Sequence, residues 1–500
     1  MHNQKLIILI VVVAILAVLA IIFIPRLLNG EQAATPDYWP TQGWLATTPE
    51  EQGLDSAKLA EALLAIQERD IPVDGLFIVR GGKVLLEAVF EPYDGSFPHD
   101  VASVTKSITT TLIGIAEAQG KLDLDDELVS FFPDREIANL DARKQAITLR
   151  HMVTNTNGFR SLCLEGDQAN ISEMQATPDW VQFALDREVV NEPGSQFCYD
   201  SPGMHLLSAV LQGATGMTEQ EFARQYLFEP LGIQETTWKT DLQGYTFGWG
   251  DLHLKMADAA KIGFLFLHKG QWDGQQIVPA DWVQEAVKPQ VQANADESYG
   301  YGWWVEEGQY NASGRGGQKV FVLPAMDVVL VSAGGGYEYD TIDPYVSGSV
   351  ADLENPLPAN PEGMAQLNAA LDAIQQPGAP FPEGVQPDPS LAISGETYVF
   401  SPNPLNVAKA SPKFDDPADA VLQLEMTSGE SITWPVGLDG RYRLAVDGQA
   451  TRGYWADPAT FILETFDVGT LDYRLHFENG RVVIEDPDLG LSAEGQLENP

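Results

Sequence analysis

Two stretches of the chain alternate between hydrophobic and polar positions with the period of two that is typical of β-strands. Residues 75–90 form the first stretch and residues 319–333 form the second. Each carries a turn signal near its centre, Gly81-Gly82 in the first and residues 324–327 in the second. The pattern therefore predicts two β-hairpins that lie far apart in the sequence.

Apolar residues recur at helical spacing in segments that flank or separate these hairpins. The clearest predicted helices are Ser56–Arg69, with Asp55 as N-cap, Lys106–Gln119 and Glu362–Ile374. The long section between the hairpins, residues 121–290, is also largely helical in pattern. Helices mixed with hairpins predict an α/β (α+β) body over residues 36–376.

A different pattern follows this body. Five prolines mark residues 377–392 as a stiff linker. Residues 393–500 then contain short alternating segments separated by Gly, Asp and Asn turns, which predicts a small all-β domain, either a barrel or a sandwich. The predicted strands are Glu396–Phe400, Ala420–Met426, Tyr442–Val446, Thr460–Thr465, Tyr473–Phe477 and Arg481–Ile484.

The first 35 residues contain nineteen consecutive apolar residues, Leu6–Ile24. This run is longer than the core of a signal peptide and suits a membrane span. We therefore expect an uncleaved anchor in the inner membrane, with the rest of the chain in the periplasm and membrane contact through this helix only. The alternative is a cleaved signal peptide and a secreted protein.

The formal net charge of −42 limits the partners of the protein, since 71 acidic residues face 29 basic ones. Nucleic-acid binding depends on basic groups that meet phosphates, so this class of partner is excluded, as is docking on anionic lipid. The chain has no H-E-x-x-H motif and no glycine fingerprint of a dinucleotide-binding fold. We expect neither a metal nor a cofactor, and a small molecule as the partner.

Candidate chemistry begins at Ser103-Val104-Thr105-Lys106, where an extended segment meets a predicted helix. Residues three apart share one face of a helix, so the Lys106 amine can reach the Ser103 hydroxyl. Tyr199 precedes another predicted helix, and the Gly-rich stretch 314–318 enters a predicted strand. Each element alone is more often structural: a capping serine with a solvated lysine, a core tyrosine and an ordinary turn.

Together and in this order, the three elements resemble the serine β-lactamase and penicillin-binding-protein superfamily. The resemblance is strongest to its class C-like branch, which includes esterases, D-amino-acid peptidases and aminohexanoate-dimer hydrolases. It extends from about Trp39 to Pro377, and some members also carry a C-terminal β domain. Further matching segments are Pro49–Asp55, Leu76–Lys83, Ile147–Val153, Tyr226–Ile233 and Tyr299–Trp304.

The resemblance implies a fold and a set of roles. The fold would be an antiparallel sheet flanked by helices, with a helical subdomain and the site in the cleft between them. Ser103 would be the acylated nucleophile, Lys106 would take its proton and Tyr199 would relay that proton. The substrate-binding and oxyanion-hole residues would be Ser201, Arg315, Gly316, Gly317 and Gln318, with the backbone N–H groups of Ser103 and Gln318 as the oxyanion donors.

Two positions depart from the pattern of true β-lactamases. Ser201 replaces an asparagine and Arg315 replaces a lysine, at positions that help to hold the amide and the carboxylate of a β-lactam. Efficient β-lactam hydrolysis is therefore not expected. Trp249, Trp303 and Trp304 are candidates for the pocket lining, although core positions are the commoner use of tryptophan.

The two cysteines, Cys163 and Cys198, leave two alternatives open. An exported chain allows a disulfide between them, which would brace the backbone next to Tyr199. Two free, buried thiols are the other alternative.

The sequence therefore predicts a serine hydrolase that forms an acyl-enzyme on Ser103 and cleaves a small ester or amide. A D-stereospecific peptidase or weak β-lactamase is the alternative within enzymes. A non-catalytic binding or scaffold protein on the same fold is the alternative from another class.

Overall fold

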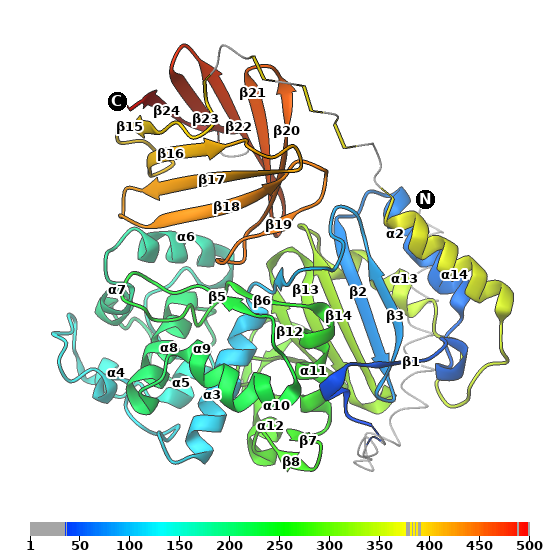
Figure 1. Cartoon of the computed structure of the whole chain (residues 1–500). Helices are drawn as coiled ribbons and strands as arrows, with labels where there is room; N and C mark the ends of the chain where they lie inside the picture. Colours follow the sequence, from blue (N-terminus) through cyan, green and yellow to red (C-terminus); the bar gives the residue numbers. More distant parts are fainter. Residues whose placement is uncertain are drawn as a thin grey trace, which may run out of the picture.

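The computed structural model describes residues 36, 38–376, 381–382, 384–385, 387–388, 392–487 and 490–498. It comprises a mixed α/β body and a C-terminal β domain (Figure 1). The body is built on a nine-stranded sheet in the order β1-β3-β2-β14-β13-β12-β11-β10-β9. Its strands are β1 (Leu45–Ala46), β2 (Val73–Arg80), β3 (Lys83–Val89), β9 (Val291–Gln292), β10 (Ser298–Tyr299), β11 (Trp304–Glu306), β12 (Gln309–Gly314), β13 (Gln318–Leu323) and β14 (Val328–Gly334).

Both predicted hairpins are confirmed, as β2–β3 and β13–β14. They lie side by side because β14 pairs with β2 in an antiparallel register that sets Leu330 opposite Ile78. Along β2 successive side chains point to opposite faces, and nearly all of them are buried. The centre of the sheet is therefore covered on both sides.

Helices cover the two faces. On one face, α2 (Ser56–Glu68) and α14 (Pro361–Ile374) pack together and contribute Leu59, Leu63 and Leu367 to a shared apolar cluster with the sheet. Asp55 caps α2 by accepting hydrogen bonds from the next turn, as the sequence predicts. The opposite face packs against α3 (Val104–Ala118) and α11 (Met256–Leu267), and α8 (Ser201–Thr215) packs on α3.

Most of the remaining elements belong to the helical subdomain and the loops around the sheet, whereas α13 packs against α2 (Figure 1). The helices are α4 (Ala142–Gln145), α5 (Leu149–Val153), α6 (Cys163–Gln175), α7 (Trp180–Asp186), α9 (Glu219–Ala223), α10 (Glu229–Leu231), α12 (Ala280–Ala286) and α13 (Asp343–Ser347), and the strands are β4 (His99–Asp100), β5 (Thr237–Trp238), β6 (Leu252–Leu254), β7 (Gln271–Trp272) and β8 (Gln275–Gln276).

The C-terminal domain is a closed nine-stranded barrel, with β19 as an additional short strand. Closure comes from pairing between β18 and β20, which leaves a barrel rather than a sandwich. Alternate residues fill its interior with an apolar cluster that includes Tyr398, Trp455 and Phe477. The strands are β15 (Tyr398–Phe400), β16 (Val407–Lys413), β17 (Asp419–Met426), β18 (Ser431–Gly437), β19 (Arg443–Leu444), β20 (Ala450–Asp457), β21 (Thr460–Asp467), β22 (Gly469–Glu478), β23 (Arg481–Asp486) and β24 (Leu491–Leu497).

The barrel packs directly against the body. Phe466, at the end of β21, stacks on Tyr93 with ring centroids 5.6 Å apart and meets the edge of His99 at 5.4 Å. The two ring nitrogens of His99 lie 2.9 Å from an Asp74 carboxylate oxygen and 2.8 Å from the Asp100 carbonyl. Burial opposes a charged ring, but the Asp74 hydrogen bond and charge outweigh it and raise the pKa of His99. Phe466 of the barrel thus packs on a histidine that is hydrogen-bonded to Asp74, just before α3.

The predicted transmembrane anchor is corrected by the structure. The longest helices that it describes, α3 and α8, have 15 residues each. A bilayer core needs about 20 apolar helical residues, and no helix of the described chain meets that requirement. The inner-membrane location and the membrane contact inferred from an anchor are overturned with it; the run Leu6–Ile24 itself lies outside the described residues.

Candidate active site

Ser103 is the N-cap residue of α3 and lies in the short turn between β4 and that helix. The preceding residue, Ala102, has a φ of 47°, which is uncommon for a residue with a side chain. The turn is held by Asp100, whose Oδ1 accepts a hydrogen bond of 2.8 Å from the Ala102 N–H. Ser103 therefore stands at a helix N-terminus, where backbone N–H groups favour negative charge.

Lys106 reaches back along α3 to Ser103. Its Nζ lies 2.8 Å from Ser103 Oγ and 2.9 Å from the carbonyl oxygen of Trp249. The side chain is buried, and this burial lowers the pKa of Lys106 to about 8, although the carboxylates of Asp167 and Asp200 act in the opposite direction. A substantial fraction of this amine is therefore neutral near pH 8.

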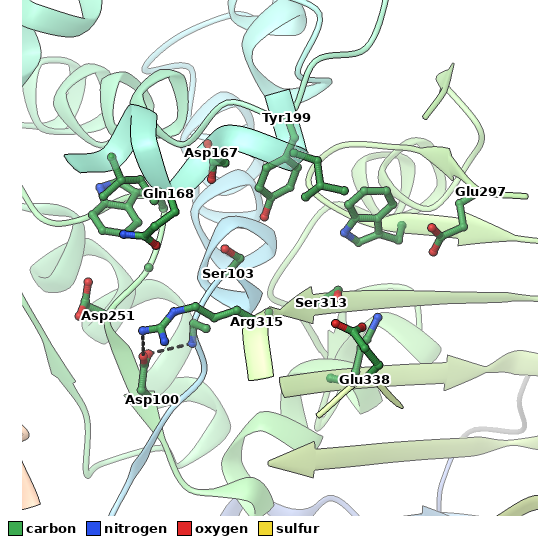
Figure 2. Close-up of a pocket in the computed structure, with 18 of the residues that line it drawn as sticks. Asp100, Ser103, Asp167, Gln168, Tyr199, Asp251, Glu297, Ser313, Arg315 and Glu338 are labelled. Atoms are coloured by element: carbon green, nitrogen blue, oxygen red, sulfur yellow. Dashed lines mark hydrogen bonds and ion pairs between the residues drawn. The ribbon is translucent and has the colours of Figure 1, made fainter. Parts of the chain in front are cut away.

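Tyr199 completes the group from the segment just before α8. Lys106 Nζ lies over its ring at 4.6 Å from the centroid. Burial raises the pKa of Tyr199 well above its usual value, and a hydrogen bond with Ser103 lowers it only in part. The ring stacks on Trp304 with centroids 5.9 Å apart. The hydroxyl, the amine and the phenol thus meet in one place. Figure 2 shows Ser103 and Tyr199 facing each other there.

The stretch 314–318 links β12 to β13 and passes close to the nucleophile. Gly314 approaches so closely that a Cβ there would lie 2.9 Å from the backbone nitrogen of Ser103. Gly317 has a φ of 96°, and a Cβ there would meet the ring of Tyr337 at 2.4 Å. The side chain of Gln318 is anchored to the Gly334 carbonyl at 2.6 Å. The glycines thus hold the start of β13 beside Ser103.

Ser201 is not brought into the cleft. It is buried at the start of α8, where its N–H and its hydroxyl donate to the two carboxylate oxygens of Asp167 at 2.9 and 2.5 Å. Asp167 itself lines the cleft. The sequence did not single out this carboxylate, because it lies within α6 without a motif of its own.

Arg315 lines the cleft and is 58% exposed, with Nη2 at 3.5 Å from Asp100 Oδ2. The cleft has a volume of about 650 Å³. Five carboxylates line the cleft (Figure 2). Among the described residues that line it, two have a cationic side chain, Arg315 and Lys319. The carboxylates come from Asp100, Asp167, Asp251, Glu297 and Glu338.

Two of the three candidate tryptophans, Trp249 and Trp304, line the cleft, whereas Trp303 is buried in the core. Within the described residues no cluster of three or more His, Cys, Asp or Glu side chains is arranged to hold a metal ion.

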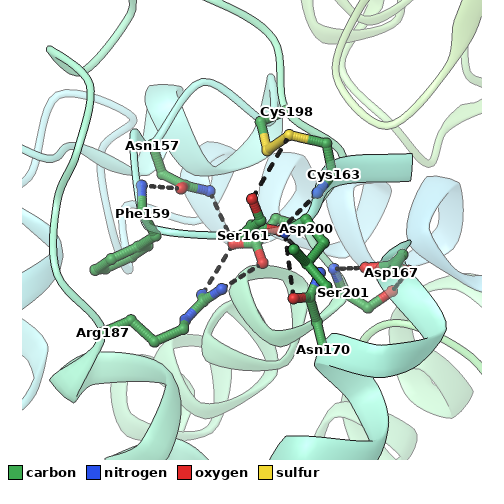
Figure 3. The surroundings of a disulfide bond; sticks show 11 residues. Asn157, Phe159, Ser161, Cys163, Asp167, Asn170, Arg187, Cys198, Asp200 and Ser201 are labelled. Atoms are coloured by element: carbon green, nitrogen blue, oxygen red, sulfur yellow. Dashed lines mark hydrogen bonds and ion pairs between the residues drawn. A yellow bond between two sulfur atoms is a disulfide. The ribbon is translucent and has the colours of Figure 1, made fainter. Parts of the chain in front are cut away.

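A disulfide joins Cys163, at the start of α6, to Cys198, immediately before Tyr199 (Figure 3). On the other side of Tyr199, Asp200 accepts two hydrogen bonds from Arg187, at 2.6 and 2.9 Å. The backbone around the phenol is therefore tied to α6 by a covalent bond and to the start of the 187–200 segment by an ion pair.

We expect the double variant C163A/C198A to unfold more easily. The two residues are 35 apart in sequence. A cross-link over a loop of this length stabilises by about 3–4 kcal/mol in the chain-entropy model. Urea denaturation followed by tryptophan fluorescence measures the loss, and the wild type in reductant should match the variant. Equal denaturation midpoints for the oxidised wild type and the variant would contradict the expectation.

Comparisons with known proteins identify the family of the chain. The profile of the Beta-lactamase family matches residues 56–333, more than half of the chain. The 6-aminohexanoate-dimer hydrolase of Paenarthrobacter ureafaciens is 24% identical over 321 residues, which cover 59% of this chain and 81% of that protein. The monacolin J acid methylbutanoyltransferase of Aspergillus terreus is 27% identical over 164 residues, 30% of this chain and 40% of that protein.

Among solved structures, the octameric penicillin-binding protein homologue from Pyrococcus abyssi is similar over 88% of this chain and 100% of its own, with a TM-score of 0.49 and 18% identity. Because the family profile covers more than half of its length, the chain belongs to the Beta-lactamase family of serine hydrolases.

Proposed function

We propose that the protein is a serine hydrolase that forms an acyl-enzyme on Ser103 and cleaves a small ester or amide. The observation that carries the proposal is the 2.8 Å contact between Lys106 Nζ and Ser103 Oγ, with Tyr199 beside both groups. A serine hydroxyl needs a neighbouring base to act as a nucleophile. The relatives' names, a hydrolase and an acyltransferase, agree with this chemistry.

The steps follow from these positions. Ser103 Oγ attacks the carbonyl carbon of the substrate while its proton passes to the neutral amine of Lys106. The oxyanion is stabilised by the backbone N–H groups of Ser103 and Gln318. As the bond to the leaving group breaks, Tyr199 passes the proton to that group. Water then attacks the acyl-enzyme. Its proton passes through Tyr199 and Lys106 to Ser103 Oγ, and the acid is released.

The charges of the cleft favour neutral esters and amides over β-lactam antibiotics, which carry a carboxylate. Arg315 contacts Asp100, and four further carboxylates line the same cleft. An anionic substrate would meet repulsion from five carboxylates, which the paired Arg315 guanidinium and the Lys319 amine do not offset.

Labelling with a fluorophosphonate probe tests the proposal. The wild type should be labelled and S103A should not, with S107A as a matched control on the same helix. Ser107 donates to the Gly302 carbonyl at 2.6 Å and is not a lining residue of the cleft, so its loss should leave labelling in place. A folded wild type that takes up no label would support a scaffold instead. Faster turnover of a chromogenic cephalosporin than of p-nitrophenyl acetate would favour the β-lactamase alternative.

A further inference from the structure

A second cavity, of about 380 Å³, lies beside the cleft on the α2/α14 side of the large sheet. Its lining is mostly apolar and comes from the sheet and from the segment that contains α13. Phe321, Leu323 and Leu330 form part of the sheet wall, and Val346 and Val350 form part of the opposite wall. Polar side chains of β11 and β12, namely Glu306, Gln309 and Asn311, also line it.

This apolar cavity adjoins the cleft along one face of the sheet, and the side chains of Glu297 and Lys319 line both spaces. On β12, Ser313 lines the cleft and Asn311, two residues earlier, lines the cavity. On the paired strand β13, Lys319 lines both spaces and Phe321 follows in the cavity. Residues two apart on a strand share a face, so the same face of β12 and β13 leads from the polar cleft to the apolar cavity.

The positions of the proton-transfer groups decide which part of a substrate points into the cavity. The leaving group needs a proton, so it has to face Tyr199 and Lys106. Figure 2 shows Tyr199 on one side of Ser103, with Ser313 and Glu338 on the other side, toward the sheet. The acyl part of the substrate, bonded to the same carbonyl carbon, therefore extends toward the sheet and the apolar cavity.

We propose that the cavity holds the apolar acyl chain of the substrate, so that the protein acts on esters or amides of medium-chain acids. This inference rests on the proposed acyl-enzyme function and names the substrate class of the same site. A polar cleft around the reacting carbonyl and an apolar cavity beyond it fit a molecule with a polar head and an aliphatic tail. Cavities of this size are typical of small-molecule sites.

A series of p-nitrophenyl esters from acetate to octanoate tests the inference, because only the acyl chain changes. Each methylene that leaves water can raise kcat/KM by up to about fourfold. We expect kcat/KM to rise from acetate through butyrate to octanoate. A steady fall from acetate to octanoate in the wild type would overturn the inference.

A variant that fills the cavity provides the second measurement. L323W places a large ring in the sheet wall and should lower kcat/KM for octanoate by about tenfold, while acetate turnover stays within about twofold, since several buried methylenes would be lost. A325W is the matched control, because Ala325 lies two residues further along the same turn and does not line the cavity. An unchanged ratio of octanoate to acetate turnover in L323W overturns the inference.

If thermal melting shows that L323W is unfolded, S347W fills the cavity from the opposite wall, at the exposed end of α13. Its octanoate-to-acetate ratio then decides in the same way. Fluorophosphonate labelling distinguishes failure of the acyl-chain cavity from failure of the proposed acyl-enzyme function. Labelling of Ser103 with no preference for long chains rejects the acyl-chain cavity alone, whereas absence of labelling rejects the proposed function.

Discussion

Replacement of Lys106 by methionine should lower kcat/KM for p-nitrophenyl acetate by about 10²–10⁴-fold, the usual contribution of a positioned acid–base group. Methionine fills a similar volume but cannot accept the Ser103 proton. In the wild type, the amine has to be neutral to act, and its pKa is lowered to about 8. The rate of acylation should therefore rise with pH and reach half of its plateau near pH 8, and this step should be absent from K106M.

The matched control is K144M. Lys144 is also buried, but its Nζ donates to the Leu185 carbonyl at 2.7 Å and it does not line the cleft. This variant should lose stability and keep the pH midpoint of the wild type. A K106M protein with the wild-type pH profile would show that another group takes the proton.

The hairpins and the long helices could be predicted because their signals are local. In β2 and β13 the alternation of side chains is set by the strand itself, and Asp55 caps α2 within one turn. The pairing of β14 with β2 could not be read in this way, since it joins segments about 250 residues apart. The resemblance to a known family implied an antiparallel sheet but did not specify this pairing.

The barrel shows where local patterns fail. The sequence missed β16, β18, β20 and β24, and each of these strands contains a proline or a glycine. Pro412 and Pro435 interrupt the first two, and Gly453 and Gly495 lie within the others. Such residues weaken a strand signal, and only long-range pairing within the closed barrel overrides them. The choice between barrel and sandwich likewise depends on the contact of β18 with β20.

In the candidate site, too, some residues could be predicted from local sequence and others could not. Ser103 and Lys106 are three residues apart on one helix, so their contact follows from helix geometry. The position of Asp167 could not be predicted, because long-range contacts place α6 at the cleft. These contacts are the disulfide and the hydrogen bonds between Asp167 and Ser201. Those same bonds explain why Ser201, expected to bind substrate, is buried under Asp167. The predicted membrane anchor failed for another reason: hydropathy alone does not establish a spanning helix.

The replacement Y199F should reduce turnover by an amount that depends on the leaving group. Phenylalanine keeps the ring that stacks on Trp304 and lies under Lys106 Nζ, and it removes only the hydroxyl. Burial raises the pKa of Tyr199 well above its usual value, so the phenol holds its proton at neutral pH and can pass it on while Lys106 accepts the proton of Ser103. A positioned proton donor contributes about 10²–10⁴-fold.

An alkyl ester or an anilide needs that proton to release its leaving group, whereas p-nitrophenolate leaves readily as an anion. We therefore expect kcat for an alkyl ester to fall by about 10²–10³-fold in Y199F and kcat for p-nitrophenyl acetate to fall by about tenfold or less. Y299F is the control, because Tyr299 is a buried neighbour with its ring 6.4 Å from that of Tyr199, and it does not line the cleft. Equal losses for the two substrates would assign Tyr199 to packing alone, because a lost ring contact cannot distinguish a good leaving group from a poor one.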